Sequence, residues 1–164
     1  MKSSLLMDFS VDKVKNQIKV KREFAAPLTK VWAAWTQKEL LDQWWAPKPW
    51  KARTKLRDFT VGGYWLYAMV GPEGEEHWAR ADFKSIEELK GFSLTDAFCD
   101  SDGKLNTEFP RTDWSITFSE GTAVTTVDII LTYAKLEDLE QIISFGFKEG
   151  FTMALENLDA LLAH

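Results

Sequence analysis

Apolar and polar residues alternate with a period of about two from Ala52 to Tyr133, and this run most restricts the fold. Such alternation predicts strands that bury one face of a sheet. Turn-forming residues interrupt the run at 71–74, 87–91 and 120–122, a polar loop covers 100–110, and Gly62-Gly63 marks a further turn or bulge. Five strands with such short connections indicate an antiparallel meander.

The residues before this run predict one strand and two short helices. Asn16 to Phe24 alternates loosely and indicates a first strand, which we expect at the edge of the sheet. Pro27 suits the first turn of a helix, where its missing N–H costs nothing. A second short helix is predicted from Lys38 to Trp45, and the prolines at 47 and 49 end it.

The C-terminal segment from Leu136 to Leu162 predicts a single long amphipathic helix, about 40 Å long at 1.5 Å per residue. Its apolar face carries leucine, isoleucine, phenylalanine and glycine. The predicted order is therefore β-α-α-β5-α, an α+β fold with a curved antiparallel sheet of about six strands. The length of 164 residues indicates one domain, 1–164, in which residues 1–14 form an N-terminal extension.

Composition excludes several classes of function. The formal net charge of −5 argues against a nucleic-acid partner, which would select a basic face. No apolar run approaches the roughly 20 residues that span a bilayer, so we expect no membrane partner. The single cysteine, Cys99, allows no internal disulfide and suits a reducing cytoplasm. His77 and His164 are too far apart for a familiar metal or triad pattern, and we expect neither a metal nor a cofactor.

Several different short motifs follow one another along most of the chain. They are Phe24-Ala25-Ala26-Pro27 before Val31-Trp32, Trp44-Trp45-Ala46-Pro47, Gly62-Gly63-Tyr64-Trp65, Met69 to Gly74, and Gly150-Phe151 ahead of Leu155 and Leu158. Their order and spacing resemble the helix-grip superfamily of START-like, Bet v 1-like proteins. Within it the chain is similar to the branch named after the C-terminal domain of the activator of the Hsp90 ATPase. Phe151 departs from this pattern, since the family often has tryptophan there.

The resemblance implies a fold in which two short helices close one end of the sheet and the long helix lies in its concave face. Members of the family include a co-chaperone domain and polyketide-tailoring and resistance proteins. The co-chaperone also has a separate N-terminal domain, which the fourteen residues before the first predicted strand are too few to supply. This argues against direct contact with a chaperone.

A long helix across a curved sheet tends to leave a cavity, and two helix positions bear on it. Gly146 and Gly150 lie on the predicted apolar face. Their missing side chains either let the sheet approach closely or leave room for a ligand. Asn157 is the one amide in the apolar arc, so it is either bonded to a nearby backbone group or directed into a cavity.

Alternation along the strands gives the candidate ligand-binding residues. Trp65, Tyr67 and Met69 share one face, which the family pattern turns inward. Phe83 and Trp114 continue that inner surface, and Trp45, beside Pro47, is placed to line an entrance. Such an aromatic stripe is either plain core or the wall of an apolar pocket with a few polar tips. If Asp96 points inward, it needs a donor such as Arg80, but strand alternation does not settle the orientation of that pair.

Three functions follow as hypotheses. The first is binding of a small hydrophobic or aromatic molecule, by Trp45, Trp65, Tyr67, Met69, Phe83, Asp96, Trp114, Gly150 and Asn157. The second is a co-chaperone-like module, with its function on an outer surface. The third is a cofactor-free cyclase or hydrolase. The sequence leaves the oligomeric state open, a homodimer included.

Overall fold

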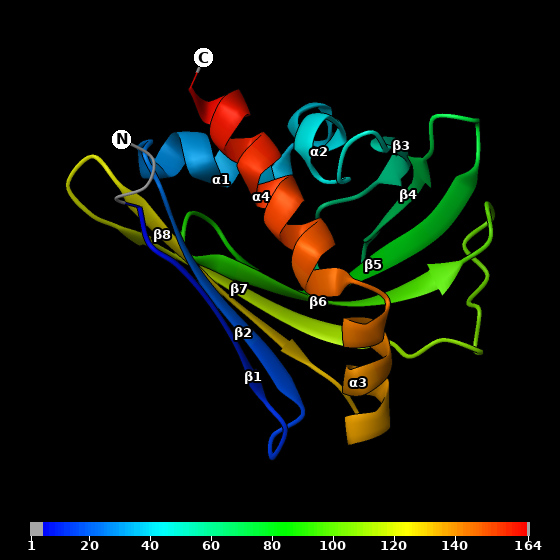
Figure 1. Cartoon of the computed structure of the whole chain (residues 1–164). Helices are drawn as coiled ribbons and strands as arrows, with labels where there is room; N and C mark the ends of the chain where they lie inside the picture. The colour runs from blue at the N-terminus through cyan, green and yellow to red at the C-terminus, as the bar shows by residue number, and fades with distance from the viewer. Residues whose placement is uncertain (1–4, 164) are drawn as a thin grey trace.

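The computed structural model describes residues 5–163, which form one eight-stranded antiparallel sheet and four helices. The sheet is open, with the order β1-β2-β8-β7-β6-β5-β4-β3, so that β1 and β3 form its edges. It curves, and α4 crosses its concave side while α1 and α2 cover one end (Figure 1). The elements are β1 (Met7–Asp12), β2 (Gln17–Phe24), α1 (Leu28–Thr36), α2 (Lys38–Trp44), β3 (Lys51–Arg57), β4 (Tyr64–Val70), β5 (Glu76–Glu87), β6 (Gly91–Cys99), β7 (Thr112–Glu120), β8 (Thr125–Thr132), α3 (Leu136–Ser144) and α4 (Phe147–Leu162).

The α+β class is confirmed, but the prediction of about six strands is wrong, for two reasons. Gly62-Gly63 is a true turn, with Gly62 at φ 88°, and it separates β3 from β4. The segment assigned to an N-terminal extension contains β1, which pairs with β2 along its whole length. The Asp12 carboxylate accepts hydrogen bonds from two backbone N–H groups and closes the hairpin between these strands.

The single C-terminal helix was also a wrong prediction, because the chain breaks between α3 and α4. Gly146 adopts a left-handed conformation, with φ 87° and ψ 27°, directly before α4 begins. Only glycine adopts this conformation at no steric cost. The apolar spacing runs on through the break, so the sequence periodicity does not reveal it. As a result α4 alone lies across the sheet, whereas α3 projects at one end, away from α1 and α2 (Figure 1).

The main core lies between α4 and the inner faces of β2, β7 and β8. Leu155 and Leu158 of α4 are fully buried, as are Ile129 and Val127 of β8. An ion pair between buried Arg22 of β2 and Asp159 of α4 adds a polar link across the same interface. Removing one partner of such a pair leaves an uncompensated buried charge, which makes the pair specific for one placement of the helix.

Tryptophans attach α1 and α2 to the sheet. Trp32 of α1 meets Phe92 of β6 and Phe118 of β7, with ring centroids 5.9 and 5.1 Å apart. Trp44 of α2 packs edge-on against Trp35 at 4.8 Å, and its indole N–H donates to the Ala34 carbonyl at 2.8 Å. Trp32 thus attaches α1 to the sheet, and Trp44 attaches α2 to α1.

Two glycine substitutions should have opposite effects on stability. Gly146→Ala places a Cβ in the left-handed region and should lower the free energy of unfolding by about 1–2 kcal/mol. Gly150→Ala lies inside α4, where a Cβ would meet only Pro47 Cγ at 3.8 Å. It should raise the free energy of unfolding by about 0.5–1 kcal/mol. Urea unfolding measures both, and a destabilised Gly150→Ala would contradict the open space at that position.

Candidate functional site

A cavity of about 310 Å³ lies between the sheet and the junction of α3 with α4. The sheet contributes Tyr67 and Met69 of β4, Asp96 of β6 and Trp114 of β7 to its wall. The helices contribute apolar side chains and glycine, namely Ile142, Phe145, Gly146, Phe147, Gly150 and Phe151. This volume lies at the lower end of the range for small-molecule sites.

Gly150 leaves space on the helix wall of the cavity. A Cβ built at this residue would have Pro47 Cγ at 3.8 Å as its one near neighbour, which is ordinary van der Waals contact. The sequence left open whether this glycine serves close packing or makes room. The geometry indicates that Gly150 leaves room, because no atom of the sheet lies within 4 Å of a Cβ built there.

An aromatic rim, formed by Phe98, Phe109 and Phe145, joins the end of β6 to the end of α3. Neighbouring ring centroids in it lie 5.2 and 6.1 Å apart. Phe145 is 56% exposed and Phe98 is 37% exposed, and both also line the cavity. Exposed apolar surface therefore continues from the outside into the cavity, and His77 lies on the same lining beside Trp50.

Trp45 forms the inner end of the cavity. Its ring contacts Trp65 of β4, Trp114 of β7 and Phe151 of α4, at centroid distances of 5.8, 5.7 and 6.2 Å. Its indole N–H donates to the Tyr67 hydroxyl at 3.0 Å. That hydroxyl keeps its own proton, because burial and the nearby Asp96 charge raise the pKa of Tyr67. Tyr67 is thus a hydrogen-bond donor at this wall.

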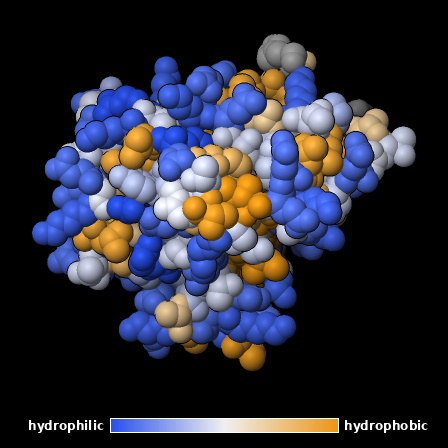
Figure 2. All heavy atoms as spheres, turned by 180° about the vertical axis from the view of Figure 1, so that it is seen from behind, coloured by the Kyte–Doolittle hydropathy of each residue, from blue (hydrophilic) through white to orange (hydrophobic). Residues whose placement is uncertain are grey.

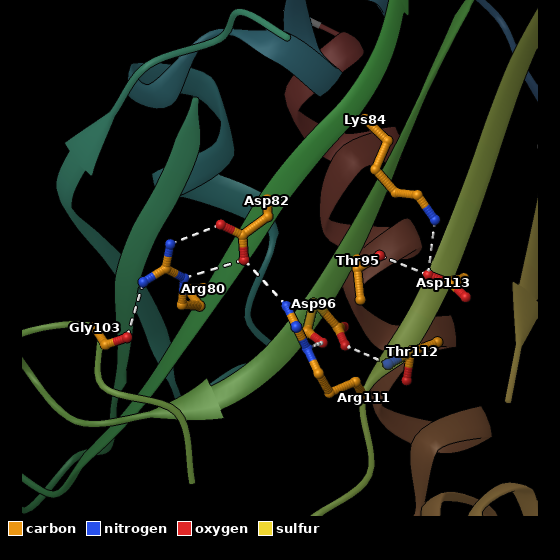
Figure 3. Close-up of polar contacts among 9 residues, drawn as sticks. All are labelled: Arg80, Asp82, Lys84, Thr95, Asp96, Gly103, Arg111, Thr112 and Asp113. Atoms are coloured by element: carbon orange, nitrogen blue, oxygen red, sulfur yellow. Dashed lines mark hydrogen bonds and ion pairs between the residues drawn. The ribbon is translucent and has the colours of Figure 1, made fainter. Parts of the chain in front are cut away.

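Asp96 places a carboxyl group in the otherwise apolar wall. Its Oδ2 accepts from the Trp114 indole N–H at 2.7 Å, and its Oδ1 accepts from the Thr112 backbone N–H at 3.1 Å (Figure 3). The Thr112 side chain also lowers the pKa of the same carboxyl. Burial nevertheless dominates and raises the pKa of Asp96 to about 6. At pH 7 the group is therefore mostly ionised, because this pH lies about one unit above its pKa.

Arg80 is not the donor to Asp96, which corrects the pairing suggested by the sequence. Arg80 binds both oxygens of Asp82, at 2.6 and 3.1 Å, and donates to the Gly103 carbonyl at 2.9 Å (Figure 3). Asp82 also accepts from Arg111 at 3.1 Å. Asp82 and Asp96 lie on opposite faces of the sheet. Asp82 pairs with Thr95, the neighbour of Asp96 on β6, and neighbouring residues of a strand point to opposite faces.

Trp65 and Phe83 lie behind the cavity, around a separate void of about 30 Å³. Arg57 enters this region from β3 and donates to the Thr36 carbonyl at 2.9 Å. Its guanidinium carbon lies 5.0 Å from the Trp65 ring centroid and 5.2 Å from that of Phe83, and burial lowers the pKa of Arg57 to about 10. These two predicted ligand residues therefore pack against a half-buried cation behind the cavity wall rather than line the cavity.

Asn157 is bonded to the backbone. Its Nδ2 donates to the Ala46 carbonyl at 3.1 Å, which ties the end of α2 to α4. It is not among the residues that line the cavity. Five side chains predicted from the sequence, those of Trp45, Tyr67, Met69, Asp96 and Trp114, do lie together there. Thr112, Tyr133 and the rim were missed, because they lie at strand ends and in loops where alternation gives no signal.

Comparison with known proteins identifies the family of this chain. The sequence profile described as "Activator of Hsp90 ATPase homolog 1-like protein" matches residues 25–163. The chain belongs to this family. The resemblance to the Hsp90-activator branch of the helix-grip superfamily is thereby confirmed.

Solved structures of family-like proteins cover nearly the whole chain. A protein from Mycobacterium smegmatis is 32% identical, with a TM-score of 0.87 and 96% of each chain covered. A protein from Arthrobacter aurescens is 29% identical, with a TM-score of 0.90, covering 95% of this chain and 91% of its own. CalU16 from Micromonospora echinospora, at 16% identity and a TM-score of 0.62 over 97% of this chain and 86% of its own, shares the fold alone. Among curated proteins no match was found.

Two features bear on cofactors and membranes. Within residues 5–163, no three His, Cys, Asp or Glu side chains are grouped so that they could hold a metal ion. None of the helices described here is long and apolar enough to cross a bilayer.

Asp96 should give stability a distinct pH dependence. Its pKa is about 6 in the folded chain, above its ordinary value of 3.8, so between these values the folded state binds more protons. Stability from this group is therefore present at low pH and is lost as pH rises through 6. Relative to Asp96→Asn, the native chain should lose free energy of unfolding between pH 5 and pH 7, as followed by urea unfolding.

Asp113→Asn is the matched control, because a hydrogen bond from Thr95 lowers the pKa of Asp113. That substitution should leave the change between pH 5 and pH 7 as in the native chain. Equal pH profiles for the native chain and Asp96→Asn would show that Asp96 is not perturbed.

Proposed function

We propose that the chain binds a small hydrophobic or aromatic molecule in the cavity between the curved sheet and the α3–α4 junction, as a cytoplasmic protein. The cavity itself carries the proposal. Its 310 Å³ have an apolar wall with a few polar tips, which is the usual composition of a small-molecule site.

The polar tips are of two kinds. The Tyr67 oxygen accepts a hydrogen bond from the Trp45 indole N–H, and the Tyr67 hydroxyl keeps its own proton to donate. The Asp96 carboxyl accepts hydrogen bonds. Hydrophobic contact would supply most of the affinity, and these groups would orient the ligand.

The placement of exposed apolar side chains favours a ligand over a co-chaperone surface. The exposed rings of Phe98 and Phe145 belong to the cavity lining as well, so their exposure fits a ligand entrance. A docking surface for a protein would need a contiguous apolar patch of several hundred square ångströms. Figure 2 shows instead small separate apolar patches among polar side chains on the face seen from behind.

A cofactor-free cyclase or hydrolase is the second candidate, and Asp96 favours it. A carboxyl with a pKa near 6 in an apolar cavity is suited to proton transfer near neutral pH. Once a ligand is identified, mass spectrometry of that ligand after incubation with the native chain and with Asp96→Asn tests this candidate. An unaltered ligand with both proteins would exclude it for that compound.

Filling the cavity should abolish binding while the fold stays intact. Gly150→Leu directs a large side chain into the space, and we expect it to weaken binding of the neutral fluorescent probe N-phenylnaphthylamine at least tenfold. Met153→Leu is the control on the same helix, since Met153 is 41% exposed and does not line the cavity. Probe fluorescence measures affinity, and circular dichroism checks the fold.

Two results would contradict the proposal. One is a native chain that does not bind the probe at all. The other is a folded Gly150→Leu variant that binds it as tightly as Met153→Leu does.

A further inference from the structure

Asp96 carries a charge that no cation in the described chain compensates. None of the ion pairs found within residues 5–163 includes Asp96. Its partners are the Trp114 indole and the Thr112 backbone N–H, both of them neutral. Burying an ionised carboxylate without a cation is costly, even when it is hydrogen-bonded.

Arginines around Asp96 are bonded to other groups. Arg57, which lines the 30 Å³ void together with Asp96, donates to the Thr36 carbonyl at 2.9 Å. Arg111 directs Nη2 to Asp82 at 3.1 Å, and its Nε reaches only the backbone carbonyl of Asp96, at 3.4 Å. Arg80 binds Asp82 and Gly103 (Figure 3). Arg111 lowers the pKa of Asp96, but this effect is the smallest of its causes, whereas burial is the largest and raises it.

The cavity gives a ligand cation a route to the carboxylate of Asp96. Asp96 lines it, and α3 and α4 present only apolar side chains and glycine on the opposite side. The other titratable groups in the lining are His77 at the exposed end and the phenols Tyr67 and Tyr133, whose pKa values burial raises. A carboxylate has about four acceptor positions, and the Trp114 indole and the Thr112 backbone N–H fill two of them.

We propose that the ligand is a hydrophobic amine, an aromatic or aliphatic body with one protonated nitrogen, whose nitrogen binds Asp96 while the body lies against Trp45, Trp114 and Phe151. This inference rests on the proposed function and adds the chemical class of the ligand. The ligand cation supplies the positive charge that pairs with the Asp96 carboxylate, in surroundings where water screens the pair little. The aromatic faces around it also favour a cation over a neutral group.

The test compares three naphthalene compounds that differ in one substituent. Naphthylmethylamine, naphthalenemethanol and naphthoate compete with N-phenylnaphthylamine for the full chain near pH 7.5, where Asp96 is ionised. In the native chain, the amine should displace the probe at a concentration at least tenfold below that of the alcohol, and naphthoate should be the weakest. In Asp96→Asn, the advantage of the amine over the alcohol should fall to less than about twofold.

Asp113→Asn is the control, because it removes a carboxylate that binds Lys84 and Thr95 and does not line the cavity. This variant should keep the tenfold advantage. The Trp114 indole N–H provides a second measurement that needs no variant, since it donates to Asp96. Its proton resonance in the native chain should shift with the amine much further than with the alcohol.

The outcomes separate this inference from the proposed function. If N-phenylnaphthylamine does not bind the native chain, the proposed function is wrong. If the alcohol or naphthoate binds as well as the amine, ligand binding stands and the amine inference is overturned. An amine advantage that persists in folded Asp96→Asn, or a Trp114 resonance that responds equally to amine and alcohol, also overturns it.

Discussion

The indole of Trp45 is the contact on which the site depends. It follows α2 directly and meets rings from β4, β7 and α4, so that one side chain fixes the distance between the sheet and the helix that crosses it. Together with Tyr67, Asp96 and Trp114 it lines both the 310 Å³ cavity and the 30 Å³ void, so these four side chains separate the two spaces. Its N–H also orients the Tyr67 hydroxyl, so packing and polarity at the inner end of the cavity share one cause.

The class of fold could be predicted from the sequence because period-two alternation and a C-terminal apolar arc are strong local signals. Two features were not predicted. Strand β1 does alternate, with Met7, Phe9 and Val11 apolar and Asp8, Ser10 and Asp12 polar, but six residues at a half-exposed edge are a short signal. The break at Gly146 preserves the apolar spacing on both sides, so only the backbone conformation reveals it. Edge pairing and chain reversal are set by tertiary contacts that a helical wheel does not represent.

The site was partly predictable for a similar reason. Parity along a strand groups residues on one face but assigns neither the direction of that face nor its depth. The family pattern turned Tyr67 and Met69 inward, and the sequence left the orientation of Asp96 open. Trp65 precedes Tyr67 on the same face and stacks on it at 4.0 Å, yet it belongs to the deeper layer. The donors to Asp96 depend on the register that sets Asp96 opposite Thr112, and a sequence without its pairings cannot supply that register. Alternation along a strand also does not show which side chains a charged residue binds, so it did not predict the partners of Arg80.

The left-handed turn at Gly146 divides two tasks between two helices. Helix α4 holds the core through Leu155 and Leu158, whereas the nine-residue α3 and the Phe145 that follows it reach the rim. Leu139 and Ile142 are buried and attach α3 to the core, whereas the other positions of that helix are half-buried or exposed. Changes confined to this short segment would alter which molecules enter without disturbing the grip of α4. The fold thus separates the part that must stay constant from the part that selection is free to vary.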